Sequence, residues 1–186
     1  MKLSLALVHY PVFDKNGRRI ASAITTFDLH DLSRVARTYG ARRLYVVTPL
    51  LDQQKLAARV LDHWRVGYGA QYNPNRKEAL DLVRVTPDIE ATVRDVTESE
   101  GEAPILIATD ARRQKGRTLS YVEARELLLC QRPVLLLFGT AWGLGREVMD
   151  SVDYVLDPVE GGTGWNHLSV RGAAAIILDR LAGGRE

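Results

Sequence analysis

The stretch Pro133-Val-Leu-Leu-Leu-Phe-Gly-Thr-Ala-Trp-Gly-Leu-Gly145 decides the fold of this 186-residue chain. Its uninterrupted apolar run from Val134 to Phe138 is typical of a parallel strand that is covered on both faces. A glycine-rich turn follows directly, and open α/β sheets bind their ligands at turns beyond the carboxyl ends of such strands. The stretch therefore indicates an α/β fold with a ligand site at this turn.

A second strand and glycine-rich turn follow in Ser151-Val-Asp-Tyr-Val-Leu-Asp-Pro-Val-Glu-Gly-Gly-Thr-Gly-Trp-Asn-His-Leu-Ser-Val-Arg-Gly172. We expect its strand over 152–156 and a closing helix over 168–181. Glycines in these turns permit a positive φ and a close approach of the backbone to a ligand.

Strands and helices alternate along the rest of the chain. We expect strands at 3–8, 44–48, 79–85 and 104–108, and helices at 28–39 (capped by Asp28), 51–64, 87–101 and from Ser120, with turns over 67–75. Glu123, three residues after Ser120, predicts a capping box. The alternation predicts one α/β domain over residues 1–186, with a mostly parallel sheet of about six strands and helices on both faces.

The charge balance, 25 Lys and Arg against 23 Asp and Glu, is too even to indicate nucleic-acid binding by composition alone. Any basic surface must be local. Two loops, Asn16 to Arg19 and Arg112 to Arg117, carry clustered basic residues that suit phosphate contacts if they lie near the ligand site, and solvated surface otherwise.

Several site classes do not fit the sequence. It contains neither a GxxxxGK[ST] phosphate loop nor a GxGxxG after the first strand, which argues against ordinary ATP or dinucleotide binding. The four histidines lack paired spacing, so we expect no metal site. The single cysteine, Cys130, which we expect to be buried, fits a reducing compartment. The apolar segment 3–8 is too short for a signal peptide or a membrane span, so we expect a cytoplasmic protein without membrane contact.

Segments 138–144, 154–156 and 166–170, with the weaker segment 28–40, resemble the motifs of the SPOUT (α/β-knot) RNA methyltransferases. The resemblance implies a carboxyl-terminal trefoil knot over about 133–182 and S-adenosylmethionine as cofactor. It also implies RNA as substrate, with a base of tRNA favoured over rRNA, and a homodimer. The glutamate that the ribose-methylating branch carries in its second motif is replaced here by Thr140-Ala-Trp142, which argues against ribose methylation.

The resemblance also assigns roles to individual residues. Arg37, Asn166 and Ser169 are the candidates for catalysis, although Arg37 also suits a solvated helix face. The expected substrate contacts are Arg18, Arg19, Arg112, Arg113, Lys115 and Arg117. The expected cofactor contacts are Thr109, Leu137, Phe138, Gly139, Thr140, Gly143, Leu156, Pro158, Gly161, Asn166, Leu168, Ser169 and Val170.

Some assignments stay open on the sequence alone. His9 and His167 each suit a general base or a hydrogen-bonded structural histidine. Trp142 and Trp165 suit base stacking or dimer packing. The whole chain also suits a knotted RNA- or nucleotide-binding module that has lost methyl transfer, or a doubly wound regulator without a knot.

Overall fold

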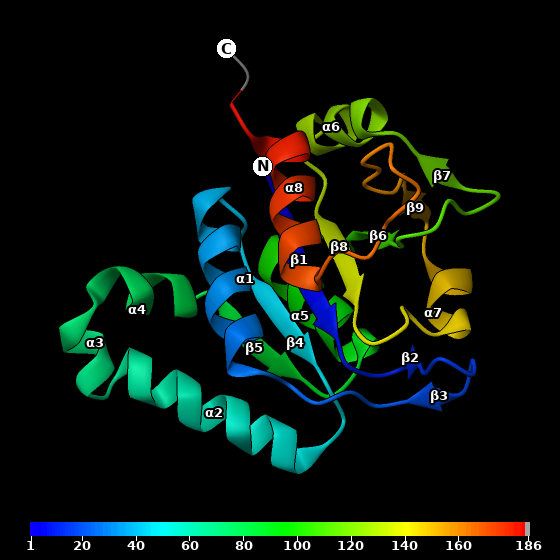
Figure 1. Cartoon of the computed structure of the whole chain (residues 1–186). Helices are drawn as coiled ribbons and strands as arrows, with labels where there is room; N and C mark the ends of the chain where they lie inside the picture. The colour runs from blue at the N-terminus through cyan, green and yellow to red at the C-terminus, as the bar shows by residue number, and fades with distance from the viewer. Residues whose placement is uncertain (185–186) are drawn as a thin grey trace.

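The computed structural model describes residues 1–184. Its centre is a seven-stranded sheet in the order β5-β4-β1-β8-β6-β9-β7, in which every pairing is parallel (Figure 1). The strands of this sheet are β1 (Leu3–Val8), β4 (Leu44–Val47), β5 (Val83–Thr86), β6 (Ile105–Thr109), β7 (Thr118–Leu119), β8 (Val134–Gly139) and β9 (Tyr154–Leu156). A separate antiparallel hairpin pairs β2 (Val12–Phe13) with β3 (Arg19–Ile20).

Helices cover both faces of the sheet, as the alternation predicted. They are α1 (Thr26–Thr38), α2 (Leu51–Arg65), α3 (Tyr68–Tyr72), α4 (Pro74–Leu80), α5 (Ile89–Glu100), α6 (Tyr121–Leu129), α7 (Arg146–Ser151) and α8 (Val170–Ala182). In Figure 1, α1 and α8 lie in front of the sheet and α5 lies behind it. None of the helices within residues 1–184 is long and apolar enough to cross a bilayer.

The protein has two hydrophobic cores, one on each face of the sheet, and strand β8 contributes residues to both. It pairs with β1 on one side and with β6 on the other, and its residues from Val134 to Phe138 are buried. Successive side chains of a strand point to opposite faces. Leu136 and Phe138 therefore pack with α1 and α8, whereas Leu135 and Leu137 pack with α5 and α7. The prediction of a strand covered on both faces is confirmed.

The amino-terminal cap of α1 differs from the expectation. Thr25, not Asp28, caps this helix, and the Thr25 hydroxyl oxygen accepts a hydrogen bond from the backbone N–H of Asp28. Asp28 sits in the first turn, where its carboxylate accepts a hydrogen bond from the Thr25 hydroxyl. Both residue types favour helix starts, so the cap residue was misplaced by three positions.

Two further expectations, the strand over 79–85 and the turns over 67–75, are wrong in part. Helices α3 and α4 occupy most of 68–80, and β5 begins only at Val83. Asn73 caps α4 and Pro74 occupies its first position, which favours helix over strand for Ala79.

Other boundaries shift by a few residues. Asp88 caps α5, so Pro87 precedes the helix instead of opening it, while Gly101 ends it with φ 78° as expected. The capping box of Ser120 and Glu123 is confirmed. Helix α8 begins at Val170 after its cap Ser169. Cys130 is exposed, because it follows the last turn of α6 at the surface.

Candidate active site

A cavity of about 860 Å³ opens at the carboxyl ends of β6 and β8, where the sequence predicted a ligand site. Its walls come from the segment before α1, the loops after β6, β8 and β9, the first turn of α1 and the amino-terminal half of α8. Ten of the predicted residues line it, namely Thr109, Arg112, Phe138, Gly139, Thr140, Gly143, Asn166, Leu168, Ser169 and Val170.

Four predicted cofactor contacts lie elsewhere. Leu137 is fully buried in the core beneath α5, because it faces the opposite side of β8 from Phe138. Leu156 is buried in the core on the other face of the sheet. Pro158 is also buried, and Gly161 is exposed with open space where a Cβ would stand.

The turn after β8 is tight enough to require glycine. A Cβ on Gly139 would lie 2.7 Å from the backbone nitrogen of Leu144 and 2.9 Å from the carbonyl carbon of Gly143. Gly143 itself has φ 109°, a conformation that L side chains rarely adopt. The hairpin holds this turn from outside, since Phe13 donates to the Gly143 carbonyl (3.1 Å) and Trp142 donates to the Phe13 carbonyl (3.1 Å).

Asn166 connects two of the loops around the cavity, and Ser169 begins the helix that follows them. The side-chain amide of Asn166 donates to the carbonyl of Ala111 at 2.6 Å, which ties the loop after β9 to the loop after β6. The Ser169 hydroxyl oxygen accepts from the backbone N–H of Gly172 at 3.2 Å and thereby caps α8. Both side chains therefore shape the cavity wall from fixed positions.

Asp28 places a buried carboxylate in the wall of the cavity, a role that its sequence assignment as a cap did not predict. The Asp28 side chain is 8% exposed and accepts a hydrogen bond from the Arg171 guanidinium at 2.8 Å. Arg171 belongs to α8, so this ion pair joins the start of α1 to the start of α8.

A hydrogen-bond chain runs from the end of β1 to the cavity. The Thr140 hydroxyl donates to the Val8 carbonyl (3.0 Å), so the Ser22 hydroxyl must donate to Thr140 (2.6 Å). Ser22 then accepts from His9 Nδ1 (2.8 Å), which leaves the buried Nε2 without a partner among the described residues. Burial lowers the pKa of His9 to about 4, against the opposing charge of Asp28, so the ring is neutral at pH 7.

Through these hydrogen bonds, His9 orients Thr140 by way of Ser22, and His9 itself does not line the cavity. Ser22 was missed because only the fold brings it, 118 positions away in sequence, against Thr140. His167 does line the cavity, and its ring lies 4.9 Å from that of Trp165. Trp142 also lines the cavity and is 63% exposed.

The predicted catalytic Arg37 does not reach the cavity of its own chain. It lies on α1 and forms an ion pair with Glu78 of α4. Among the predicted substrate contacts, only Arg112 lines the cavity. Arg112 itself pairs with Asp110, and three of the other five form ion pairs: Arg18 with Asp14, Arg19 with Glu147, and Arg113 with Asp157 and Glu160. Lys115 and Arg117 form none within the described part of the chain.

The cavity fits S-adenosylmethionine by volume and by chemistry. Small-molecule sites typically enclose about 300–1,000 Å³ and combine apolar walls with a few polar groups. Here Phe138, Leu168 and Ile177 provide apolar contact for an adenine ring, and the open space at the Cβ position of Gly143 lets a ligand approach the backbone. The Asp28 carboxylate and the Thr140 hydroxyl supply polar groups at the same wall.

Comparison with solved structures shows the same fold in methyltransferases. TrmJ from Z. mobilis ZM4 superposes with a TM-score of 0.62 at 16% identity, covering 98% of this chain and 70% of that one. The SpoU methyltransferase AviRb from Streptomyces viridochromogenes, in complex with AdoMet, gives 0.57 at 19% identity, covering 96% of this chain and 56% of that one.

Relatives found by sequence comparison share more residues with this chain than those two structures do. A tRNA (guanine-N(1)-)-methyltransferase of Nitratidesulfovibrio vulgaris is 44% identical over 181 residues, which are 97% of this chain and 42% of that protein. The chain thus spans less than half the length of this relative. An uncharacterized protein of Aquifex aeolicus is 40% identical over 178 residues, which are 95% of this chain and 86% of that protein.

Residues 2–183 match the family described as SAM-dependent RNA methyltransferase. This match covers nearly the whole chain and agrees with the fold, the cavity and the relatives. The chain therefore belongs to the family of S-adenosylmethionine-dependent RNA methyltransferases, and its cofactor is S-adenosylmethionine.

Proposed function

We propose that the chain methylates a base of tRNA and that the reaction takes place in the cavity at the ends of β6 and β8. The observation that carries this proposal is the meeting of Phe138, Gly139, Asn166 and Ser169 at one cavity, from loops that the sequence separates. The guanine-N1 specificity in the name of the 44% identical relative favours a tRNA base, although the chain covers 42% of that relative.

The residues of the cavity have distinct roles in this proposal. When bound, the cofactor supplies a methyl group already activated on a sulfonium, so the protein must chiefly hold a nucleophile in line, about 3–3.5 Å away. Phe138 and Leu168 exclude water from one side, and the open space at Gly143 lets the cofactor approach the backbone of the turn that Gly139 keeps tight. Asn166 keeps the loops after β6 and β9 in register through its hydrogen bond to Ala111, and Ser169 fixes the start of α8 as its cap.

A homodimer and a trefoil knot over about 133–182 also belong to the proposal. Arg37 lies outside the cavity of its own chain, so a role for it in methyl transfer requires the cavity of a second copy. Arg112 at the cavity edge, with Arg113, Lys115 and Arg117 on the same loop, would contact the RNA. A cytoplasmic location, whose reducing environment the single cysteine fits, is consistent with a tRNA substrate.

Labelled methyl transfer to RNA from a strain lacking this protein tests the activity, and mass mapping then identifies the nucleoside. We expect label in tRNA, on a base. Asn166→Ala, which frees the loop after β9 from Ala111, should lower transfer at least tenfold, and Arg37→Ala should do so through the second copy. If neither variant loses activity, the catalytic assignment is wrong.

Calorimetry with S-adenosylmethionine separates the alternatives. Binding without transfer to any RNA would favour a knotted binding module in place of an active tRNA methyltransferase. Sedimentation equilibrium tests the dimer, and a monomer with full activity would exclude a role for Arg37 in a partner's cavity.

A further inference from the structure

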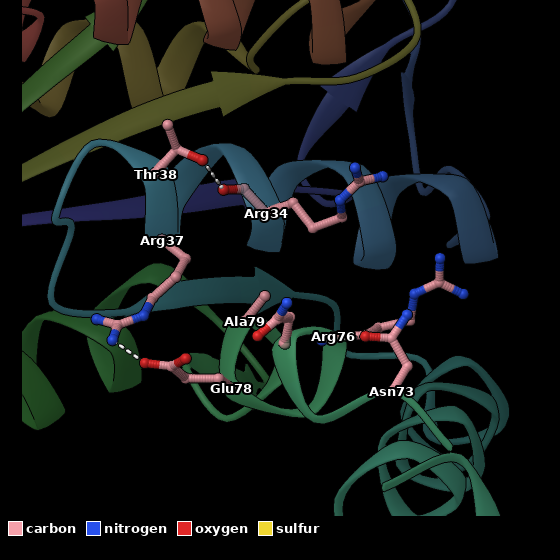
Figure 2. Close-up of a pocket in the computed structure, with 8 residues that line it drawn as sticks. Arg34, Arg37, Thr38, Asn73, Arg76, Glu78 and Ala79 are labelled. Carbon is pink, nitrogen blue, oxygen red and sulfur yellow. Dashed lines mark hydrogen bonds and ion pairs between the residues drawn. The ribbon is translucent and has the colours of Figure 1, made fainter. Parts of the chain in front are cut away.

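A second pocket, of about 390 Å³, lies between α1 and α4 and is lined by three arginines (Figure 2). Helix α1 connects it to the first cavity: Asp28, near the start of the helix, lines the cavity, whereas Arg34 and Arg37 line the pocket. Arg34 lies six positions after Asp28 on this helix, which is about 9 Å along the axis. A polymer whose reacting group enters the cavity can therefore reach the pocket.

The three arginines differ in their partners. Arg37 turns toward Glu78 and is neutralised by that carboxylate, whereas the side chains of Arg34 and Arg76, which also line the pocket, turn away from Glu78 (Figure 2). Within residues 1–184, neither Arg34 nor Arg76 forms an ion pair. Two like charges on facing helices repel each other unless an anion lies between them.

Arg76 is held in place while part of its hydrogen-bonding capacity stays unused. Its guanidinium lies over the ring of Trp64, 4.7 Å from the centroid, and its Nε is buried without a hydrogen-bond partner among the described residues. Buried donors without partners are costly, so such a donor indicates a missing acceptor.

The pKa of the neighbouring His30 is affected by the same positive charges. Burial lowers its pKa, and the charges of Arg76 and Arg34 lower it further against the opposing effect of Asp31. The guanidinium groups of Arg34 and Arg76 therefore both lie close enough to His30 to act on its partly buried ring. An anion bound there would be held by charge-assisted hydrogen bonds from both arginines.

We propose that the pocket between α1 and α4 binds a backbone phosphate of the RNA substrate, through Arg34 and Arg76. This rests on the proposed function, because it takes RNA as the substrate. A polymer fits better than a free anion because α3 places Tyr72 directly before Asn73 of the pocket. Tyr68 and Tyr72 are 72% and 73% exposed, and stacked bases favour such aromatic surfaces.

RNA affinity measured against salt concentration tests the pocket. The probe is a fluorescently labelled tRNA transcript, bound to the full chain between 50 and 300 mM KCl. Each lost phosphate contact lowers the slope of log K against log[salt] by about 0.7–0.9. Because both arginines hold the same phosphate, we expect Arg34→Gln/Arg76→Gln to lower the slope by about one such step, and Arg34→Gln alone to lower it by part of that step. Arg34 is exposed, so its single variant keeps the test valid if the double variant folds poorly.

The matched control is Arg94→Gln on α5, an exposed arginine on the opposite face of the sheet. It should keep the wild-type slope, and all variants should bind S-adenosylmethionine as tightly as the wild type by calorimetry. An unchanged slope in both pocket variants, or an equal drop in the control, overturns the proposal. Competition by inorganic phosphate at matched ionic strength, with tRNA binding unaltered in the variants, assigns the pocket to a free anion instead.

The two proposals fail in different ways. A wild-type chain that binds tRNA but transfers no methyl group contradicts the proposed function, while the slopes of the variants still decide the role of the pocket. A wild-type chain that binds S-adenosylmethionine but no RNA contradicts both.

Discussion

The shape of the cavity wall depends on the absence of a side chain at Gly139. In Gly139→Ala the new Cβ would meet backbone atoms of Gly143 and Leu144 at under 3 Å, and backbone cannot move aside as a flexible side chain does. Overpacking of this kind typically costs about 1–3 kcal/mol. We expect the turn to shift and the Kd for S-adenosylmethionine, measured by calorimetry, to rise at least tenfold.

Gly161→Ala is the matched control, because Gly161 has open space around its Cβ position. It should change neither the Kd nor the melting temperature measurably. Equal cofactor affinity in the two variants would contradict the role of the Gly139 turn, and weaker binding in Gly161→Ala would restore Gly161 as a cofactor contact.

His9 makes the stability of the fold depend on pH. Its pKa falls from 6.5 in an unfolded chain to about 4 in the folded one, chiefly through burial. The unfolded state therefore takes up a proton first as the pH falls, so the stabilisation is complete above pH 6.5 and is lost toward pH 4. A shift of this size corresponds to about 3 kcal/mol in total.

Urea unfolding at pH 7.5 and pH 5.0 checks this effect. The wild type should lose about 2 kcal/mol more than His9→Gln between these conditions, since glutamine does not titrate there. Identical pH dependence in the wild type and His9→Gln would show that the His9 pKa is not lowered in the folded chain.

At the scale of elements, the sequence predicted those whose pattern is unambiguous. The apolar run Val134 to Phe138 has no helical period, and it forms the central strand. The pair Ser120 and Glu123 specifies a helix start by its own chemistry. The strand predicted to include Ala79 and Leu80 was wrong at these positions, because a short apolar run suits a buried helix as well as a strand. The hairpin of β2 and β3 was missed because its strands are only two residues each.

The residues of the candidate site also fall into those that local sequence predicted and those that it did not. The glycine turn after β8 and the segment Asn166 to Val170 were found from local sequence, and both line the cavity. Leu137 was misplaced because neighbouring residues of a strand face opposite sides of the sheet. Asp28 and Ser22 gain their roles only from partners more than a hundred residues away, which no local pattern encodes.

Arg171 links α8 to α1 through two ion pairs, one with the buried Asp28 at the cavity wall and one with the more exposed Asp31 at 3.4 Å. Arg171→Met would leave the Asp28 carboxylate, 8% exposed, without its cationic partner. Removing one partner of a fully buried pair costs about 3–5 kcal/mol, and we expect about 1–3 kcal/mol because Arg171 is partly exposed. Urea unfolding measures this loss directly.

Arg132→Met is the matched control for this prediction. Arg132 and Glu102 form an ion pair whose side chains are 53% and 49% exposed, and such pairs contribute at most about 1 kcal/mol. A loss in Arg171→Met no larger than the loss in Arg132→Met would show that the ion pair does not hold α1 and α8 together. Asp28→Asn/Arg171→Met should recover part of the stability, because it removes the buried charge.

At the scale of the whole molecule, cofactor and RNA should each protect a different side of α1 from hydrogen exchange. The cavity takes its walls from loops after β6, β8 and β9, whereas the arginine pocket takes its walls from α1 and α4. Local opening is suppressed where a ligand binds the closed form. S-adenosylmethionine alone should therefore slow exchange over 109–112, 139–143 and 164–170, and leave 73–79 at its free rate.

Adding tRNA to the cofactor complex should then slow exchange over 73–79, and Arg34→Gln/Arg76→Gln should abolish this second effect while keeping the first. At 100 times the Kd a ligand stabilises the folded chain by about 2.7 kcal/mol, and a local opening that releases the ligand should slow by roughly a hundredfold. Protection of 73–79 by the cofactor alone would mean that α4 responds to the cavity through α1, so that exchange there could not be assigned to RNA contact.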